Sequence, residues 1–517
     1  MPLPLEAPQL AKEGLELSLA LLKSRAEFGT DAPPVTIEVF LSGGLPSFSI
    51  VGMPETAVRE SKDRVRGAIL SSGFKFPQER ITVNLGPADM RKTGGRYDLA
   101  IAIGILVAGR QVPATSVTDI EFYGELGLNG EIRPVPGVLP AALNAAAAGN
   151  SIVVAVANGA EAALSRAETR VAGTMLEVTA HLCCRQELQP LAAVQPEPCC
   201  TGAPDLAEVK GQRHAKRALE IAAAGGHNAL FIGPPGTGKS MLARRLPGIL
   251  PPMSEAEALE TAAIDSVLGQ PLDLTRWRRR PFRAPHHTAS AAALVGGGSV
   301  PRPGEVSRAH RGVLFLDELP EFNRNVLEVL REPLEAGVIT IARAARQAEF
   351  PAEFQLIAAM NPCPCGYLGD AGGDCGCSAE RVATYRGKIS GPLLDRIDLH
   401  IEVGRPPKEA LRGGQLAEET SAAVAERVRQ ARSVQLRRGG VCNARLEGND
   451  IESFCSLSEE CLQLLENAVD RFNLSARTYH RVLRVARTIA DLAGAEAIRP
   501  PHIGEALALR LLDRRTR

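Results

Sequence analysis

The stretch "GPPGTGKS" at residues 233–240 follows the apolar run "ALFI" and leads into a segment with helical character. It satisfies the pattern G-x-x-x-x-G-K-[ST], in which backbone N–H groups surround phosphate oxygens. In such a loop Lys239 contacts the β- and γ-phosphates of a nucleotide, and Ser240 contacts Mg²⁺. The sequence therefore predicts a site for ATP and Mg²⁺ made by Gly233, Pro234, Pro235, Gly236, Thr237, Gly238, Lys239 and Ser240.

Two further apolar runs end in polar residues. The run in "GVLFLDELPEF" ends in Asp317 and Glu318, and "FQLIAAMN" ends in Asn361. We expect Asp317 to hold Mg²⁺ through its water shell, and Glu318 to act as general base on the attacking water. Polar groups at the ends of parallel strands line the crevice of an open α/β sheet. Taken alone, Asn361 could equally cap a strand before Pro362.

Four of the eleven cysteines lie within fifteen residues: Cys363, Cys365, Cys375 and Cys377. Four thiolates from two short arms can give Zn²⁺ a closed tetrahedral shell, as in structural zinc sites. The C-x-C spacing is a less common arm than C-x-x-C, and four reduced thiols in a loop are the alternative. The pattern favours a structural zinc site.

Two segments could contact DNA. "TRWRRRPFRAPHH" has five arginines interleaved with Trp277 and Phe282, which suits phosphate contact and base stacking, with a solvated basic loop as the alternative. "GVITIARAARQAEFPAEF" predicts a hairpin with arginines at its tip. Lys+Arg and Asp+Glu both number 59, so DNA binding would depend on such local clusters. The candidate DNA contacts are Arg278, Arg279, Arg280, Arg343 and Arg346.

Several domains must position these residues, because 517 residues exceed the size at which a single core stops growing. The proline-rich segment 189–206 predicts a linker. Residues 1–188 alternate β-rich and helical runs, which predicts an α/β domain. We expect a second α/β core over 207–404, with the cysteine-rich insertion 363–377, and an all-α region over 405–517.

No segment of the chain predicts a membrane or secretory protein. The longest apolar run, "LAIAIGILVAG", is too short to cross a bilayer. The first residues lack the basic and apolar regions of a signal peptide. An odd number of cysteines argues against a disulfide framework. We therefore expect a cytoplasmic protein with no membrane partner.

Residues 205–517 resemble AAA+ ATPases of the magnesium-chelatase and minichromosome-maintenance helicase branch, with the phosphate loop as Walker A and the strand-end acids as Walker B. The resemblance implies that Asn361 is the sensor-1 residue. It also implies that Arg396 in "LLDRID" is an arginine finger, which reaches the γ-phosphate of a neighbouring subunit, and that Arg477 is the sensor-2 arginine of a helical lid. By spacing alone, Arg396 could be an ion-paired surface residue. An arginine acting in trans requires a ring, and the family forms homo-hexamers.

The resemblance extends through "RAPHHTAS", "GGGSVPRPGEVSRAHRGVLFLDELPEF", "NPCPCGYLGD" and "YRGKISGPLLDRIDLH" to the bacterial ComM (YifB) group, and covers nearly the whole chain. Members are associated with natural transformation. The resemblance implies a hexameric ATP-dependent helicase that drives branch migration of recombining DNA, with single-stranded and branched DNA as partners. A chelatase-type motor subunit that remodels a metal-insertion partner is the alternative, because it shares every nucleotide motif.

The N-terminal domain resembles the Lon-protease-like domain of this group. Proteases of that fold use a serine nucleophile activated by lysine. Aligned on the protease pattern, Arg96 in "RKTGGRYD" takes the place of the serine, and Leu139 in "RPVPGVLPAA" takes the place of the lysine. Because nucleophile and base are both missing, we expect no proteolysis by this route.

Overall fold

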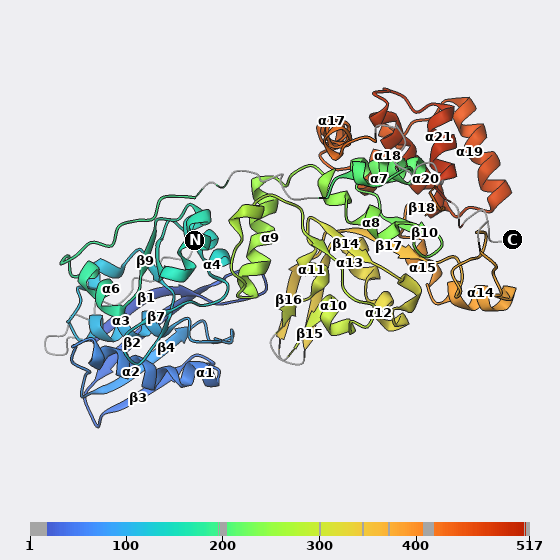
Figure 1. The fold of residues 1–517 in the computed structure, drawn as a ribbon. Coiled ribbons are helices and arrows are strands. Elements are labelled where there is room, and N and C mark those ends of the chain that lie inside the picture. Colours follow the sequence, from blue (N-terminus) through green and yellow to red (C-terminus); the bar gives the residue numbers. More distant parts are fainter. Residues whose placement is uncertain are drawn as a thin grey trace, which may run out of the picture. The chain divides into compact units, whose positions relative to one another are not determined.

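The computed structural model describes residues 18–194, 196, 204–298, 301–343, 346–370, 373–406, 418–510 and 512. The chain divides into two compact units, and each is described by itself (Figure 1). The first comprises residues 1–195 and 262–272, and the second comprises 196–261 and 273–517. Residues 195, 197–203 and 407–417, which fall in the predicted linker and at the predicted start of the helical region, lie outside the described residues.

The first unit is built on a seven-stranded mixed sheet in the order β3-β4-β2-β1-β5-β8-β9. In β2, Val35, Ile37, Val39 and Leu41 are buried, and the residues between them are more exposed, as a strand with one face on a core requires. The strands are β1 Ser18–Arg25, β2 Pro34–Ser42, β3 Ser47–Val51, β4 Arg80–Gly86, β5 Ile120–Phe122, β8 Ser151–Ala155 and β9 Thr169–Ala172, and β6 Glu125–Leu126 pairs separately with β7 Ile132–Arg133.

Helix α3, Asp98–Ala108, is the central helix of this unit, and every residue in it is buried. A Cβ at Gly104 would lie 2.6 Å from Val39 and 2.8 Å from Leu22, so glycine lets α3 approach β1 and β2 closely. The apolar run "LAIAIGILVAG" is therefore a core helix. The other helices are α1 Thr56–Arg59, α2 Ser61–Ser71, α4 Val138–Ala147, α5 Gly159–Ala162 and α6 Met175–Leu182.

The second unit contains a five-stranded sheet in the order β11-β14-β17-β10-β18, and every pairing in it is parallel. All residues of β10, β14 and β17 are buried, as expected for strands covered on both faces. Because the strands are parallel, their carboxyl ends meet at one edge. The strands are β10 Ala229–Ile232, β11 Phe282–Arg283, β14 Val313–Leu316, β17 Gln355–Met360 and β18 Leu399–Glu402.

Helices and two small hairpins surround this sheet. The helices are α7 Arg213–Gly225, α8 Lys239–Ala243, α9 Glu255–Val267, α10 Ala291–Val295, α11 Glu305–Arg308, α12 Arg324–Glu328, α13 Arg331–Ala336, α14 Ala379–Gly387 and α15 Gly391–Leu394. The hairpins pair β12 Gly296–Gly297 with β13 Arg302–Pro303, and β15 Val338–Arg343 with β16 Arg346–Pro351. The last residues of α9 are counted with the first unit, where Ser266 Oγ accepts a hydrogen bond from the backbone N–H of Leu139 at 3.2 Å. Sequence patterns did not predict this assignment.

The end of the described chain is helical, as predicted. It contains α17 Ser421–Gly439, α18 Asn449–Phe454, α19 Glu459–Phe472, α20 Ala476–Leu492 and α21 Pro500–Ala508. Val482 of α20 belongs to the same apolar core as Phe231 of β10. The expected succession of an α/β domain, a parallel α/β core and C-terminal helices is confirmed. Among the described helices, none has the length and hydropathy that a bilayer crossing requires.

Candidate nucleotide site and cysteine cluster

The loop between β10 and α8 has the backbone that a phosphate cradle needs. Gly236 and Gly238 have φ values of +77° and +90°, which residues other than glycine rarely adopt. A Cβ at either position would meet no atom within 4 Å, so both glycines border open space. The loop can therefore admit a bulky anionic group against its backbone.

Lys239 is buried beneath this loop, with 8% of the residue exposed. Its Nζ donates to the carbonyls of Gly233 at 2.7 Å and Pro234 at 2.9 Å, and to Asn361 Oδ1 at 3.2 Å. Burial lowers the pKa of Lys239, and the charge of Asp317 opposes this shift. The structure thus brings together the predicted phosphate-contacting lysine and the predicted sensor at the end of β17.

Ser240 and Asp317 form the next contact along the strand ends. Ser240 Oγ donates to Asp317 Oδ2 at 2.6 Å, although the two residues are 77 positions apart. A hydroxyl and a carboxylate are the oxygen donors that Mg²⁺ accepts alongside water and phosphate. The donor set fits this ion.

Glu318 follows Asp317 in a strained conformation. Its φ is +53°, in the left-handed region that a residue with a Cβ seldom occupies. Strain of this kind costs roughly 1–3 kcal/mol and clusters at functional sites. The Glu318 side chain is more than half exposed, so solvent can reach its carboxylate.

His287 also belongs to this cluster, and sequence reasoning missed it. Its Nδ1 lies 3.2 Å from Glu318 Oε2, and its ring meets Phe322 edge-on at 6.5 Å. "RAPHHTAS" showed two adjacent histidines, but no spacing rule connects them to a carboxylate 31 residues beyond His287. The sequence carried no signal for this contact, which arises because β11 pairs with β14 and the segment after β11 therefore lies beside the end of β14.

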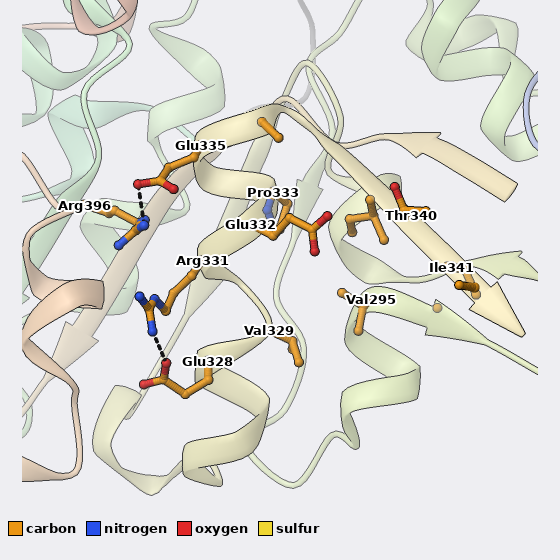
Figure 2. Close-up of a pocket in the computed structure, with 14 residues that line it drawn as sticks. Val295, Glu328, Val329, Arg331, Glu332, Pro333, Glu335, Thr340, Ile341 and Arg396 are labelled. Carbon is orange, nitrogen blue, oxygen red and sulfur yellow. Dashed lines mark hydrogen bonds and ion pairs between the residues drawn. The ribbon is translucent and has the colours of Figure 1, made fainter. Parts of the chain in front are cut away.

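Arg396 and Arg477 lie together at a different place. Both line a cavity of about 650 Å³ whose lining includes no residue of the phosphate loop. Arg396 is 7% exposed, and its guanidinium is ion-paired with Glu335, whereas Arg477 is exposed in the first turn of α20. Figure 2 shows Arg396 and Glu335 at the edge of an adjoining pocket of about 600 Å³, with the pair Arg331–Glu328 on the same wall.

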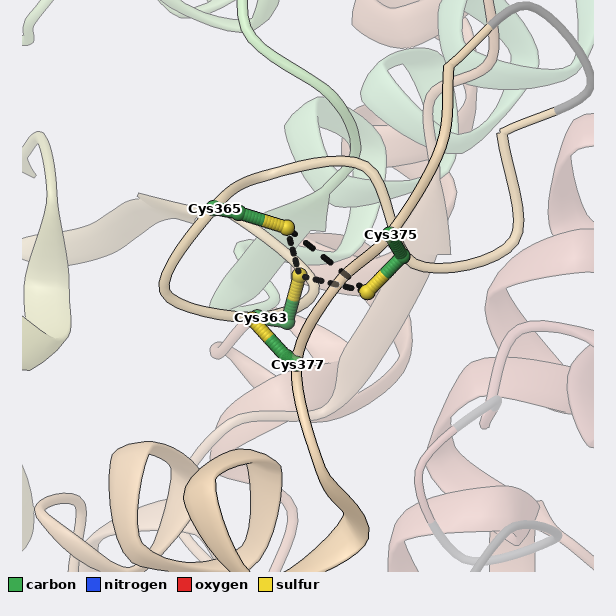
Figure 3. A group of neighbouring side chains, drawn as sticks. All are labelled: Cys363, Cys365, Cys375 and Cys377. Atoms are coloured by element: carbon green, nitrogen blue, oxygen red, sulfur yellow. Dashed lines mark hydrogen bonds between the residues drawn. The ribbon is translucent and has the colours of Figure 1, made fainter.

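The four predicted zinc ligands meet in space. The Sγ atoms of Cys363 and Cys365 are 3.3 Å apart, and Cys375 Sγ lies 3.7 Å from the first and 3.6 Å from the second. With Cys377, all four sulfurs lie within 4.8 Å of one another (Figure 3). A backbone N–H of Tyr367 directed at Cys365 lowers the pKa of that thiol to about 6. All four cysteines are free of disulfides.

Most side chains of the first predicted DNA segment make contacts within the protein. Trp277 is 7% exposed, so its ring is not a free stacking surface. Arg278 Nε donates to the carbonyl of Met253. Arg280 donates to two backbone carbonyls at 2.7 Å and pairs with Glu257 at 3.3 Å. Packing and backbone carbonyls engage these three side chains, and their contact with DNA stays a prediction.

Arg279, Arg343 and Arg346 are the other predicted DNA contacts. Arg279 is half-buried in the same segment. The predicted hairpin is present as β15 and β16, with Arg343 paired in register to Arg346 at its tip. Both side chains at the tip, and residues 344 and 345, lie outside the described part of the structure.

In the first unit, the two positions aligned with a protease dyad carry no catalytic chemistry. Arg96 is 2% exposed and donates to the carbonyl of Pro136, and Leu139 is fully buried in the first turn of α4. A guanidinium bound to a carbonyl and an aliphatic side chain supply neither nucleophile nor base.

The parallel sheet, the glycine loop and the acids at its carboxyl edge define a P-loop protein of the AAA+ class. The family model described as "Magnesium chelatase, subunit ChlI" matches residues 205–411, and its C-terminal counterpart matches residues 418–510. A third model, "Subunit ChlI of Mg-chelatase", matches residues 37–158 of the first unit.

Full-length relatives narrow this class. The competence protein ComM of Haemophilus influenzae is 49% identical over 503 residues, covering 96% of this chain and 98% of the relative. YifB of Salmonella typhimurium is 49% identical over 500 residues, with the same coverage. The magnesium-chelatase 38 kDa subunit of Cereibacter sphaeroides is 24% identical and covers 59% of this chain and 90% of the subunit. The chain belongs to the ComM/YifB family of magnesium-chelatase-like AAA+ proteins.

Proposed function

We propose that this protein hydrolyses ATP at the carboxyl edge of its parallel sheet. The observation that carries the proposal is the convergence of Lys239, Ser240, Asp317 and Asn361, which come from three separate strand ends. Lys239 would leave its carbonyl partners for the β- and γ-phosphates, and Asn361 would contact the γ-phosphate. Bound Mg²⁺ supplies neutralisation of the phosphate charge. Ser240 and Asp317 would hold that ion.

Glu318 would activate the attacking water. Its carboxylate is accessible to solvent and lies one residue beyond the magnesium-binding acid. His287 holds this carboxylate at 3.2 Å, so the base would turn from the histidine toward the water when the site is occupied. Positioning of the nucleophile is the main work of a protein in phosphoryl transfer.

The active assembly in this proposal is a homo-hexameric ring. Arg396 and Arg477 share one cavity, and the phosphate loop is absent from its lining, which supports completion of each site by a neighbouring subunit. An arginine supplied in trans contributes about 10³–10⁵-fold to turnover in related phosphoryl transfers. Arg396→Ala should bind nucleotide normally and lose turnover.

Mixing variants tests the shared site. Lys239→Ala destroys one half-site and Arg396→Ala destroys the other, so a mixed ring contains some interfaces with both halves intact. The mixture should recover part of the ATPase rate that neither variant has alone. Complete failure to complement, with rings still formed, would place Arg396 outside the neighbouring active site.

The work done by the ring is proposed to be translocation on DNA and branch migration of recombination intermediates in natural transformation. The resemblance to ComM, a protein named for competence, supports this substrate. Single-stranded and branched DNA should stimulate the ATPase. Pore contacts should neutralise phosphates without reading bases, because a motor must pass every sequence.

Arg343 and Arg346 are the proposed pore contacts, together with Arg279. Removing Arg343 and Arg346 should reduce the slope of log affinity against log salt by about one for each phosphate that is no longer neutralised. Arg429 and Arg437 are exposed on α17, and their double alanine variant is the matched control for the removal of positive charge. Equal slopes for both variants would place DNA elsewhere.

A chelatase-type motor subunit is the second candidate. It is supported by the matching family models and by the magnesium-chelatase subunit at 24% identity. The two candidates differ in their response to nucleic acid. An ATPase rate unaffected by single-stranded or branched DNA at low salt would favour the chelatase-type function.

A further inference from the structure

The cysteine cluster has the dimensions of a site for one metal ion. With metal–sulfur distances of about 2.3 Å, a tetrahedral shell places its sulfurs about 3.8 Å apart. The three closest contacts are 3.3, 3.6 and 3.7 Å, and all four sulfurs lie within 4.8 Å. A disulfide would need about 2.05 Å. Four sulfurs this close enclose a single ion, with no room for a cluster of several irons.

We propose that Cys363, Cys365, Cys375 and Cys377 bind one Zn²⁺ and that this metal holds the loop against the phosphate loop. Four thiolates and no open position are typical of structural zinc. The metal site stands on the cysteine geometry alone, whereas its effect on nucleotide binding rests on the proposed function.

The loop has little apolar material to order it. Its sequence contains five glycines between residues 366 and 376. Among the described residues from 363 to 378, Cys363 is the one apolar side chain that is fully buried. Structural zinc in small peptides contributes about 10–16 kcal/mol of apparent binding free energy, which is ample to close such a loop.

Gly366 connects the cluster to the nucleotide site. It lies between Cys365 and the rest of the loop with φ +88°, and its N–H donates to the carbonyl of Cys363 at 3.0 Å. A Cβ at Gly366 would lie 2.7 Å from Pro235 Cδ and 3.9 Å from Asn361 Cγ. The backbone beside the metal therefore packs directly on the phosphate loop and on the amide that contacts Lys239.

The other arm is tied to the same strand end. Cys377 is followed by Ser378, whose side chain caps α14. Arg386 of that helix donates from Nη2 to the carbonyl of Pro362 at 3.2 Å. Both arms thus return to the residues that follow Asn361, and one ion can fix the end of β17 relative to the phosphate loop.

Metal content is the first test. Protein purified without chelator should contain one zinc per chain by elemental analysis, and Cys365→Ser with Cys377→Ser should lose it. Cys184→Ser, an exposed cysteine of the first unit, is the control and should keep it. Metal-free wild-type protein, or iron in place of zinc, would overturn the proposal.

Titration with Co²⁺ tests the metal ligands in wild-type protein, so its result does not depend on whether the cysteine variants fold. Wild-type protein stripped of zinc and titrated with Co²⁺ should show thiolate charge-transfer and tetrahedral d–d bands that saturate at one ion per chain. Absence of these bands in protein that still binds Co²⁺ would place the metal on other ligands.

A pair of glycine variants tests the contact between the cysteine loop and the phosphate loop separately from metal binding. This contact, made by Gly366 on Pro235, is called the brace. Gly366→Ala should weaken binding of a fluorescent ATP analogue and retain zinc, because its methyl group would press on Pro235. Gly369→Ala carries the same backbone strain, with φ +80°, but its Cβ would meet nothing within 4 Å, so it should bind nucleotide more tightly than Gly366→Ala. Equal affinities would overturn the brace.

The failure of each proposal can be recognised separately. Zinc at one ion per chain in a protein that binds no ATP would reject the nucleotide function and leave the metal site established. Nucleotide affinity unchanged after zinc removal would reject the brace and leave the nucleotide function intact.

Discussion

Two buried lysines, one in each unit, make the same kind of contact and differ in what surrounds them. Each donates from Nζ to two backbone carbonyls: Lys92 to those of Pro87 and Met90, and Lys239 to those of Gly233 and Pro234. Burial lowers the pKa of both ammonium groups.

The polar groups and the open space around the two lysines differ. Lys239 also contacts Asn361, lies near the charges of Asp317 and Glu318, and sits beneath a loop with open glycine positions. Lys92 is fully buried, and the one charge that raises its pKa is that of Asp89. A buried cation therefore indicates a ligand site only where polar groups converge on it beside open space. Otherwise it holds a loop together.

The largest expected difference is between Lys239→Met and Lys92→Met. The first should fold normally and lose detectable ATP binding, because its ammonium is the proposed main phosphate contact. The second should bind ATP and lose stability, since two backbone carbonyls each lose a hydrogen bond from a charged donor, worth about 1.5–3 kcal/mol. Thermal unfolding and binding of a fluorescent ATP analogue measure both effects. If Lys92→Met impaired ATP binding and left stability unchanged, the contrast between the units would fail.

Two glutamates provide the next test. Glu318→Gln should keep nucleotide binding and lower turnover about 10²–10⁴-fold, the usual contribution of a general base. Glu121 of the first unit is 1% exposed and pairs with Arg25 at 2.9 Å. Glu121→Gln leaves a buried arginine without its counter-charge, which costs about 3–5 kcal/mol of stability and should spare the turnover per folded chain. Wild-type turnover in Glu318→Gln would reject the base assignment.

His287→Ala should change the rate of hydrolysis more than the affinity for ATP. The pair with Glu318 is partly exposed, and such pairs contribute up to about 1 kcal/mol, so the rate should change by at most about fivefold. Because the histidine would restrain the proposed base before ATP binds, its loss should raise the basal rate and reduce stimulation by DNA. His214, an exposed histidine of the same unit, supplies the control His214→Gln. Identical rates and stimulation in both variants would remove His287 from the mechanism.

Lowering the pH should destabilise the second unit more than the first, and this is the smallest of the expected effects. His400 of β18 is buried in the second unit, and desolvation holds its pKa well below the ordinary value. The unfolded chain takes up this proton near pH ~6.5 and the folded chain does not, so stability falls as the pH drops below that value. The first 195 residues contain one histidine, His181, so the first unit should respond less.

Scanning calorimetry between about pH 7.5 and pH 5.5 checks this difference. The transition of the second unit should move to lower temperature more than that of the first. His400→Leu should flatten the pH dependence of the second unit. A pH dependence unchanged in that variant would assign the effect to other groups.

Much of the fold was readable from local pattern. Continuous apolar runs such as "GVLFL" predicted buried strands, and the three-and-four spacing after residue 418 predicted the C-terminal helices, because burial on one or both faces imposes these periods. The meeting of the glycine loop with the strand-end polar groups also followed from the sequence, because each motif acts through backbone geometry close in sequence. The burial of Trp277 and the internal hydrogen bonds of Arg280 were not predicted, because nothing local distinguishes a solvated basic segment from one whose arginines bind distant carbonyls.

The amino-acid sequence by itself determined the succession of domains, the phosphate loop with its acids, and the four cysteines that could share a metal. Tertiary structure decided the rest. It placed His287 on Glu318, Gly366 on Pro235, and Arg396 with Arg477 away from the phosphate loop. These contacts join residues far apart in the chain or of types without a motif, and only the order of the strands and the packing of the loops bring such residues together.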